Sequence, residues 1–469
     1  MISIRTPCRY LSTALFLLGV AGLATMLGGG VAAAQGTTQT LNDALAGAYS
    51  SNPTLSAARA ALRGVNEGVP QALSNWRPRV TLNGSAGAQY SDVTSSTTNS
   101  DGSSLPTEAS VEVVQPLYRG GRTLAGTEAA ENDVLAERSN LVSVEQQVLF
   151  NAVSAFMDVW RDRAIVDLNQ NNERVIRRQL EATQDRFSVG EVTRTDVAQA
   201  ETRLATATAQ RIAAEGSLAA NRAVFEEVIG FQPQNLVVPR DIPGLPNGKD
   251  EVVAQAVAGN PDVLSASFAE KASRYRVRET AGELLPNLQL RATASRRDDS
   301  TQRDTSAEQA EILAEVSIPL YQQGSVSSRV RQAKQVSSQR RVQIEERRRN
   351  TQQQAVSAWE NLVSARAQIV SFQAGVRSAE IALEGVRQEN LVGARTILDI
   401  LDAEQELLNA QVNLVGAQRD EVVASFQILS VMGRLTAAEL NLPIEIYDPQ
   451  ADYNKVRDKW FGLSAPSAD

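Results

Sequence analysis

Two segments of the sequence read Phe187-Ser188-Val189-Gly190-Glu191-Val192-Thr193-Arg194-Thr195-Asp196 and Asn390-Leu391-Val392-Gly393-Ala394-Arg395-Thr396-Ile397-Leu398-Asp399. Each has a glycine, which suits the left-handed position just after a helix. The Thr-x-x-Asp that follows is typical of a capping box at the start of the next helix, with aspartate in place of the usual glutamate or glutamine. Each segment therefore predicts a tight turn between two helices.

The two turns belong to an internal repeat. At the turns the copies match at an offset of 203 residues, and the same offset relates Pro116-Leu117-Tyr118 to Pro319-Leu320-Tyr321. Nearer the start of each copy the offset is 208, as Asn52-Pro53 and Asn260-Pro261 show. An offset that holds over so long a stretch indicates two copies of one structural unit.

The repeat sets the expected organisation of the chain. We expect the first helix-strand-strand-helix copy at residues 35–240, the second at 241–443 and a C-terminal tail at 444–469. The change from 208 to 203 requires a length difference of five residues in the first half of each copy. We assign the extra residues to the Ser/Thr/Gly-rich stretch 91–104, which we interpret as an exposed loop.

The first 34 residues predict a secretory signal peptide. Arg5 and Arg9 precede an apolar run from Leu11 to Leu27, and Ala32-Ala33-Ala34 supplies small residues for cleavage. Cleavage would remove Cys8, the one cysteine, and the chain has no histidine. These absences exclude histidine-dependent triads, thiol nucleophiles and the usual zinc ligand sets. We expect an exported protein that is not an enzyme and binds no cofactor or metal.

Charge and hydropathy limit the remaining classes. The formal net charge of −8 argues against nucleic acid as a partner. The arginine-rich stretch 340–349 is interrupted by Glu345 and Glu346, and it reads as a solvated helix face. After residue 34 no apolar run approaches the roughly 18 to 20 residues of a transmembrane helix. If the chain crosses a membrane, we therefore expect it to do so as a β-barrel.

Each copy holds two stretches in which apolar and polar residues alternate. We expect strands at approximately 79–90, 108–118, 287–296 and 309–320. Strands of about ten residues can cross a bilayer when tilted. Two soluble hairpins packed on a helical core are the alternative interpretation. Four strands are too few to close a barrel, so membrane-spanning copies must share one, and three copies would supply twelve strands.

Long helices are expected between the strands and the turns. The stretches 120–190 and 324–393 lack proline, and a continuous helix of that size would be on the order of 100 Å long. After each turn, pairs of adjacent residues that are mainly apolar recur every seven residues, as in a coiled coil whose helices have neighbours on two sides. These pairs are Val197/Ala198, Leu204/Ala205, Arg211/Ile212, Leu218/Ala219 and Phe225 in the first copy and Ile400/Leu401, Leu407/Leu408, Leu414/Val415, Glu421/Val422 and Ile428/Leu429 in the second.

The repeated order of elements, the prolines at the helix-to-strand joints and the two turns resemble the TolC family of outer-membrane efflux and type I secretion proteins. The resemblance covers essentially the whole mature chain. It implies a mainly α fold with a β-barrel part, in which a trimeric α-helical barrel is continuous with a 12-stranded transmembrane β-barrel. It also implies an internal two-fold repeat and four strands per protomer.

The function that the resemblance implies is that of an outer-membrane channel extending into the periplasm. Such a channel is the exit duct of a tripartite efflux pump or a type I secretion system, and it exports small molecules or proteins passively. The implied partners are two further copies of the chain, a periplasmic adaptor protein, and an inner-membrane ABC exporter or proton-driven pump. Outer-membrane lipid is a partner as well, and nucleic acid is not.

The resemblance also implies a gate at the periplasmic end. Asp399 and Asp402 are three residues apart on one helical face, so threefold symmetry would form two rings of carboxylates that attract cations. By the resemblance, Arg395 takes part in the polar links that hold this constriction closed, and Asp196 and Gln179 are partners of the second turn. Capping alone is the alternative explanation for Asp196 and Asp399.

The turns carry two further expectations. Gly190 and Thr193 in the first turn, with Gly393 and Thr396 in the second, are expected to dock the periplasmic adaptor. By the resemblance, relatives carry a tyrosine at position 390, where it takes part in the polar links that hold the gate closed. This sequence has Asn390 there, so the hydrogen bonds expected in the closed state are different.

Two rival classes are weighed against the channel. A periplasmic coiled-coil adaptor would show one helical hairpin with flanking β-domains, not two copies with bilayer-length strands. A trimeric surface adhesin would gather its barrel strands at the C-terminus. Here no strand is expected after the second copy. Tyr447–Gly462 resembles a subset of the TolC family tied to type I secretion in alphaproteobacteria.

Overall fold

The computed structural model describes residues 38–94, 99–239, 244–299 and 304–465 of the chain. The expected signal peptide with Cys8, and the expected boundary between the copies at 240/241, lie outside the described residues.

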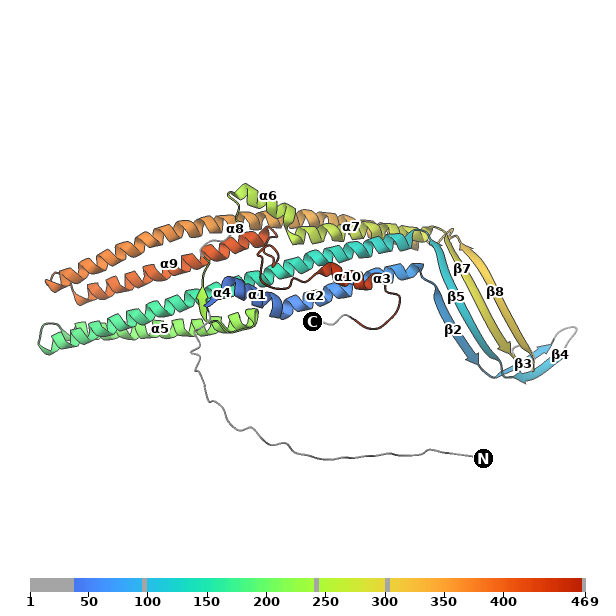
Figure 1. The fold of residues 1–469 in the computed structure, drawn as a ribbon, viewed down its shortest axis with the longest axis horizontal. Coiled ribbons are helices and arrows are strands. Elements are labelled where there is room, and N and C mark those ends of the chain that lie inside the picture. The colour runs from blue at the N-terminus through green and yellow to red at the C-terminus, as the bar shows by residue number, and fades with distance from the viewer. Residues whose placement is uncertain (1–37, 95–98, 240–243, 300–303, 466–469) are drawn as a thin grey trace, which may run out of the picture. The chain divides into compact units, whose positions relative to one another are not determined.

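The described elements follow the repeated order that the sequence predicts (Figure 1). The first copy consists of β1 (Thr38–Thr40), α1 (Leu41–Ser51), α2 (Pro53–Asn66), α3 (Gly68–Leu73), the 3-10 helix η1 (Ser74–Trp76), β2 (Arg79–Ala86), β3 (Gln89–Thr94), β4 (Asn99–Ser104), β5 (Thr107–Arg119), α4 (Arg122–Ser188) and α5 (Arg194–Ile229). The second consists of β6 (Asn235–Val237), α6 (Lys249–Gly259), α7 (Pro261–Ala281), the 3-10 helix η2 (Gly282–Leu284), β7 (Asn287–Asp298), β8 (Ser306–Ser317), α8 (Ser325–Leu391) and α9 (Ile397–Val431), and α10 (Pro449–Val456) lies in the tail.

The repeated Asn-Pro pairs start a helix and tie it to the rest of its copy. Asn52 accepts a hydrogen bond from the Thr54 N–H, and proline occupies the first helical position of α2, where a missing N–H costs nothing. The Asn52 side-chain amide also donates to the Val228 carbonyl at the end of α5 (3.1 Å). Asn260 does the same for α7, donating to the Val431 carbonyl at the end of α9 (3.0 Å).

The four-stranded sheet has the order β2-β5-β7-β8, with antiparallel pairing throughout. In the first hairpin Arg79 pairs with Val114, and in the second Asn287 pairs with Ser317. These pairs are related by the offsets of 208 and 203, so the internal repeat extends to the hydrogen-bond register of the strands. Among the described elements, β2 and β8 each have one neighbour and form the two edges of this sheet.

The two faces of the sheet differ in chemistry. The register places apolar side chains on one face, and many of them are exposed. They are Val80, Leu82, Val111, Val113, Leu288, Leu290, Ala292, Ala294, Ile312, Ala314 and Val316. The other face carries ion pairs across the strands, from Arg291 to Glu112 (2.6 Å) and Glu315 (3.1 Å) and from Arg297 to Glu108 (3.0 Å).

Two strand predictions require correction. The strand expected at 79–90 ends at Ala86, and the stretch 91–104, interpreted as a loop, contains most of a further strand pair, in which β3 pairs with β4. The strand expected at 309–320 lies instead at Ser306–Ser317. Backbone groups form the hydrogen bonds between strands, so a stretch rich in serine and threonine can still pair as a hairpin. Pro319 has no N–H to donate and lies beyond the end of β8.

The long helices α4 and α8 each run for 67 residues, as the proline-free stretches predict. Helix α4 packs against α5, α7 and α9, while α8 packs against α6, α7 and α9 (Figure 1). In the part of the chain that the structure describes, none of the helices combines the length and the apolar character needed to cross a membrane.

The seven-residue seams are confirmed in the second copy and wrong in part of the first. In α9, Leu401 and Leu408 are buried as expected. In α5, Ile212 is exposed, and Ala200, Ala207 and Ala214 are buried instead of the expected Ala198 and Ala205. The difference follows from the neighbours, because α9 packs against both α8 and α4, whereas α5 packs mainly against α4.

A glycine pair joins β5 to α4. Gly120 and Gly121 have φ values of 63° and 73°, in the left-handed region. A Cβ on Gly120 would lie 2.3 Å from the Gly282 carbonyl oxygen, whereas a Cβ on Gly121 would meet nothing within 4 Å. The close approach of the backbone at Gly120 therefore holds the first strand-to-helix joint against η2 of the second copy.

The pair provides a matched test of this contact. We expect Gly121→Ala to cost about 1 to 2 kcal/mol, the penalty of a left-handed alanine. Gly120→Ala should lower the heat-unfolding midpoint further, because the Gly282 carbonyl must also move. Circular dichroism of the two variants measures both midpoints, and equal shifts would contradict the contact.

Candidate functional site

The turns between the paired helices have nearly identical geometry. Gly190 and Gly393 have φ values of 84° and 78°, and their N–H groups donate to the Phe187 and Asn390 carbonyls at 3.0 Å. Each turn therefore ends one helix and redirects the chain within a few residues, as glycine in the left-handed conformation allows.

Both turns are followed by complete capping boxes. The Thr193 N–H donates to the Asp196 carboxylate (2.8 Å), and the Asp196 N–H donates back to the Thr193 hydroxyl oxygen (3.3 Å). Thr396 and Asp399 repeat these contacts at the same distances. The carboxylates of Asp196 and Asp399 are thus held at the starts of their own helices.

The cap also changes the acidity of Asp399. Hydrogen bonds from the Thr396 hydroxyl and backbone N–H lower the pKa of its carboxyl below the usual 3.8, with a smaller contribution from the charge of Arg395. Asp399 therefore carries its negative charge at neutral pH.

Asp402 has a different partner from Asp399. Its carboxylate accepts a hydrogen bond from Arg203, so this ion pair links α9 of the second copy to α5 of the first. Both side chains are more than a third exposed. An exposed pair of this kind contributes little to stability, and the position remains accessible to solvent.

Arg395 and Asn390 stabilise their own turn. The Arg395 guanidinium donates to Glu389 (2.9 Å) and lies 3.9 Å from the Asp399 carboxylate. The Asn390 side-chain amide donates to the Arg395 carbonyl (2.8 Å). In this structure Asn390 therefore closes the α8–α9 turn from within.

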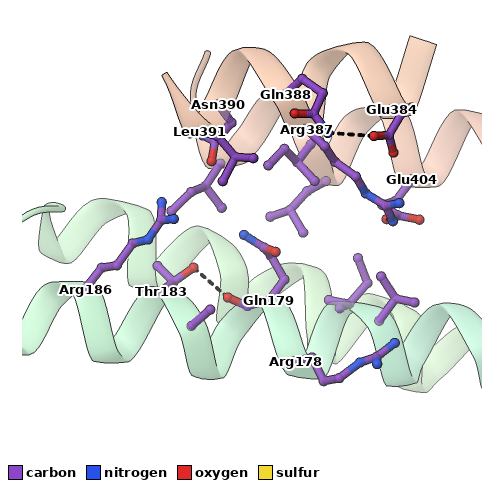
Figure 2. A pocket seen from close by; sticks show the side chains of 16 residues that line it. Arg178, Gln179, Thr183, Arg186, Glu384, Arg387, Gln388, Asn390, Leu391 and Glu404 are labelled. Carbon is purple, nitrogen blue, oxygen red and sulfur yellow. Dashed lines mark hydrogen bonds and ion pairs between the residues drawn. The ribbon is translucent and has the colours of Figure 1, made fainter. Parts of the chain in front are cut away.

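A cavity of about 440 Å³ separates the α4–α5 pair from the α8–α9 pair near the turns. Gln179 and Thr183 line it from α4, and the Gln179 side chain points toward the opposite helices (Figure 2). Asn390 and Ile397 line it from the second copy. Gln179 thus lines the same cavity as Asn390 of the second turn, whereas Asp196 does not line it.

The cavity also contains an ion pair that the sequence pattern did not predict. The Arg387 guanidinium of α8 donates to the Glu404 carboxylate of α9, and Glu404 is only 7% exposed. Glu404 matches Glu201 in the repeat, and a glutamate within an apolar heptad region was the available signal. A buried carboxylate with its partner removed is strongly destabilising, so this pair holds the two helices together near the turn.

No group of three His, Cys, Asp or Glu side chains within the described residues could hold a metal ion. The region of the turns combines helix caps, exposed carboxylates and a cavity lined by polar side chains. These features suit electrostatic control of what passes through a channel.

Comparison with known proteins identifies the family. The sequence profile of the Outer membrane efflux protein family matches residues 44–230 and 252–434, one match for each copy of the repeat. Together the matches cover well over half of the chain, and the chain belongs to this family.

Relatives that match over most of the chain are named as outer-membrane and secretion proteins. The outer membrane efflux protein BepC of Brucella suis biovar 1 is 36% identical, with 94% of this chain and 96% of BepC covered. The outer membrane protein TolC of Escherichia coli K12 is 27% identical over 83% of this chain and 81% of TolC. The alkaline protease secretion protein AprF of Pseudomonas aeruginosa is 25% identical, covering 78% of each.

Solved structures show the same fold. The outer-membrane channel OprN has a TM-score of 0.73 at 20% identity, with 84% of this chain and 89% of OprN covered. The outer membrane protein VceC of Vibrio cholerae also has a TM-score of 0.73, at 19% identity, with 84% and 96% covered. The expected fold class, that of the TolC-like outer-membrane channels, is confirmed.

Family membership decides between the classes that the sequence left open. The chain is an outer-membrane channel protein that extends into the periplasm, and it is neither an enzyme nor an adaptor or adhesin. Channels of this family are homotrimers that work with periplasmic adaptor proteins and with inner-membrane pumps or ABC exporters.

The cap at Asp399 predicts a pH-dependent turn. Because the folded pKa of Asp399 is lowered, the stability it contributes is fully present above 3.8 and is lost as pH falls through the folded value. We expect the start of α9 to lose hydrogen-exchange protection, corrected for intrinsic rates, as the pH falls below 3.8 and through the lower folded pKa.

The variant Asp399→Asn supplies the control. It lacks the titrating group, so protection at the start of α9 should already be reduced at neutral pH and change little on acidification. An equal loss in wild type and variant would contradict the assignment to Asp399.

Proposed function

We propose that three copies of this chain close into one exit duct, through which the cargo of an inner-membrane exporter passes to the cell exterior. The observation that carries the proposal is the two-faced sheet with its two edge strands. Its apolar face suits lipid, and its face of ion-paired arginines and glutamates suits a water-filled lumen.

The internal repeat supports a specific mode of closure. Unpaired strand edges cannot remain exposed in lipid, so β8 of one copy must pair with β2 of the next. Because β8 repeats β5 and β2 repeats β7, the observed β5–β7 junction serves as the template for this pairing. Val111 lies opposite Ala294 within the chain. The offsets of 203 and 208 then place Ala314 opposite Ala86 of the next copy.

A cysteine pair tests this register. The mature chain is expected to contain no native cysteine, and the variant Ala86→Cys/Ala314→Cys should form a disulfide between neighbouring copies. Within one copy the two positions are three strand spacings apart, about 14 Å, which exceeds the reach of a disulfide. We expect covalent dimers and trimers on a non-reducing gel, and their loss after reduction.

The off-register variant Leu82→Cys/Ala314→Cys is the control. It shifts one cysteine by four residues, about 13 Å along the strand, and should not cross-link. Equal cross-linking of both variants, or none in a protein shown to be trimeric by mass, would contradict the proposed closure.

The gate expected from the sequence is also part of the proposal. Threefold symmetry would gather Asp399 and Asp402 into rings, and both carboxylates are partly exposed. Arg395 orders the turn that carries Asp399, and Gln179 faces that turn across the cavity. Asp196 is proposed to act in the same constriction from the first turn. Carboxylate rings in a narrow pore favour cations over anions.

Conductance tests the ring. In planar bilayers the wild-type trimer should be cation-selective, and Asp402→Asn should lower the cation-to-anion permeability ratio several-fold without disturbing the cap at Asp399. The matched control is Asp420→Asn, the same charge change 18 residues along α9. Equal effects of the two variants would contradict a selectivity ring at the turn.

The turn residues Gly190, Thr193, Gly393 and Thr396 are proposed to form the adaptor-docking end. The neighbouring side chains of Val189 and Val392 are well exposed, which is unusual for valine in a helical protein. Apolar side chains on a rigid turn offer an adaptor a small, ordered contact surface.

The exporter, and not the duct, determines which cargo is transported. The relatives named for efflux and for protease secretion support export of small molecules and of proteins alike. An efflux pump and a type I exporter are therefore both proposed partners.

A further inference from the structure

The C-terminal tail ends in an ordered segment beside the first strand of the sheet. The Arg77 guanidinium donates to the Lys459 carbonyl (2.7 Å) and lies 4.8 Å from the centre of the Trp460 ring. The Lys459 ammonium donates to the Ser464 carbonyl (2.8 Å), which closes the segment into a turn. Arg77 lies two residues before β2, so the tail is attached where the helices give way to strands.

The same segment exposes large apolar side chains. Trp460 is 65% exposed, Phe461 90% and Leu463 fully. We call these three residues the tail patch. A cation–π contact and a charge-assisted hydrogen bond hold the segment in place, so the exposure is not that of a loose chain end. Ordered aromatic residues that protein does not cover usually mark a contact surface.

We propose that the tail patch is an interfacial membrane anchor that inserts into the periplasm-facing phospholipid leaflet of the outer membrane. The proposal rests on the proposed function, because that function places the helix-proximal ends of the strands at the periplasmic surface of the membrane. Tryptophan favours this boundary because its ring is apolar and its N–H can remain hydrated.

Charge supports a lipid partner. Arg77 contacts Lys459 and Trp460, and Arg79 follows it at the start of β2. Asp458 is paired with Arg457 (3.3 Å), while Glu445, Asp448 and Asp452 line a pocket together with Lys459 on the side of α10. Basic side chains beside apolar ones match the phosphate groups and acyl chains of a phospholipid surface. Val80, three residues after Arg77, is also exposed and begins the apolar face of β2 that is assigned to lipid.

The segment that follows β8 in the neighbouring copy, residues 318–324, is the rival occupant. The proposed register places Tyr321 of the next copy opposite Val80, within a few residues of Arg77. That segment contains no acidic residue. It would therefore bring no counter-charge to Arg77 and Arg79, whereas lipid phosphate supplies one.

The anchor would be connected to the helices α4 and α1. The tail is fixed to α4 through hydrogen bonds from Arg138 to Gln450 (2.7 Å) and an ion pair between Arg457 and Glu131 (3.5 Å). The Tyr447 N–H donates to the Tyr49 hydroxyl in α1 (3.1 Å). Insertion of the patch would therefore set the depth of the helices below the membrane as well as that of the strands.

Tryptophan fluorescence tests the anchor. The chain contains four tryptophans, and Trp76→Phe/Trp160→Phe/Trp359→Phe leaves Trp460 alone. The full-length trimer is placed in vesicles of phosphatidylethanolamine and phosphatidylglycerol whose acyl chains carry bromine. We expect several-fold stronger quenching of Trp460 by bromine near the headgroups than by bromine near the chain ends, and little quenching by aqueous iodide.

A variant that retains only Trp359, on α8, is the matched control and should not respond to brominated lipid. If the triple variant fails to fold, Phe461→Cys in the otherwise native chain, labelled with a fluorophore, gives the same readout from a position in the tail patch that is 90% exposed in the single chain. Quenching by iodide and not by lipid would overturn the anchor. Shielding from both would also overturn it, in favour of a protein contact.

The Ala86→Cys/Ala314→Cys cross-link, introduced into the same background, separates the two proposals. A cross-linked trimer whose Trp460 does not contact lipid overturns the anchor alone. Loss of the cross-link together with the lipid contact overturns the closed duct on which the anchor depends.

Discussion

The pairing of backbone hydrogen-bonding groups at the sheet edges is the constraint on which the rest of the structure depends. A copy of the chain contributes the strands β2, β5, β7 and β8, and the outermost two lack a second neighbour among the described elements. In lipid such edges must be paired. The internal repeat solves this problem because the junction inside one copy has the same geometry as the junction needed between copies. One strand register can then generate a closed structure from three identical chains.

The same repeat explains how a sheet with an exposed apolar face is connected to a distant polar turn. Gly120 and Gly121 redirect the chain from β5 into α4, and the helix then runs without a break for 67 residues, roughly 100 Å. The turn at its end needs no contact with the sheet to be ordered, since its capping box supplies the missing hydrogen bonds locally. The strand end and the turn end can therefore meet different chemical demands within one chain.

The two copies are equivalent in sequence pattern but not in their surroundings. Helix α9 packs against α8 and α4 and buries a heptad seam, whereas α5 has α4 as its main neighbour and buries small alanines instead. Near the turns, Glu404 is buried against Arg387, while its counterpart Glu201 is exposed. This asymmetry concentrates the cavity and the ion pairs on the second turn, where the acidic residues of the proposed gate also lie.

Local pattern in the sequence was sufficient for the repeat, the long helices, the glycine turns and the capping boxes at Thr193 and Thr396, because each depends on residues close together in the chain. It was also sufficient for the alternation that defines the faces of β7 and β8. The tertiary structure alone decided the partners of Arg387, Asp402 and Arg77, since these contacts join residues whose distance in space has no signature in their spacing. It likewise decided the hairpin of β3 and β4 and the buried seam of α5, because backbone pairing and the number of packing neighbours are properties of the folded chain.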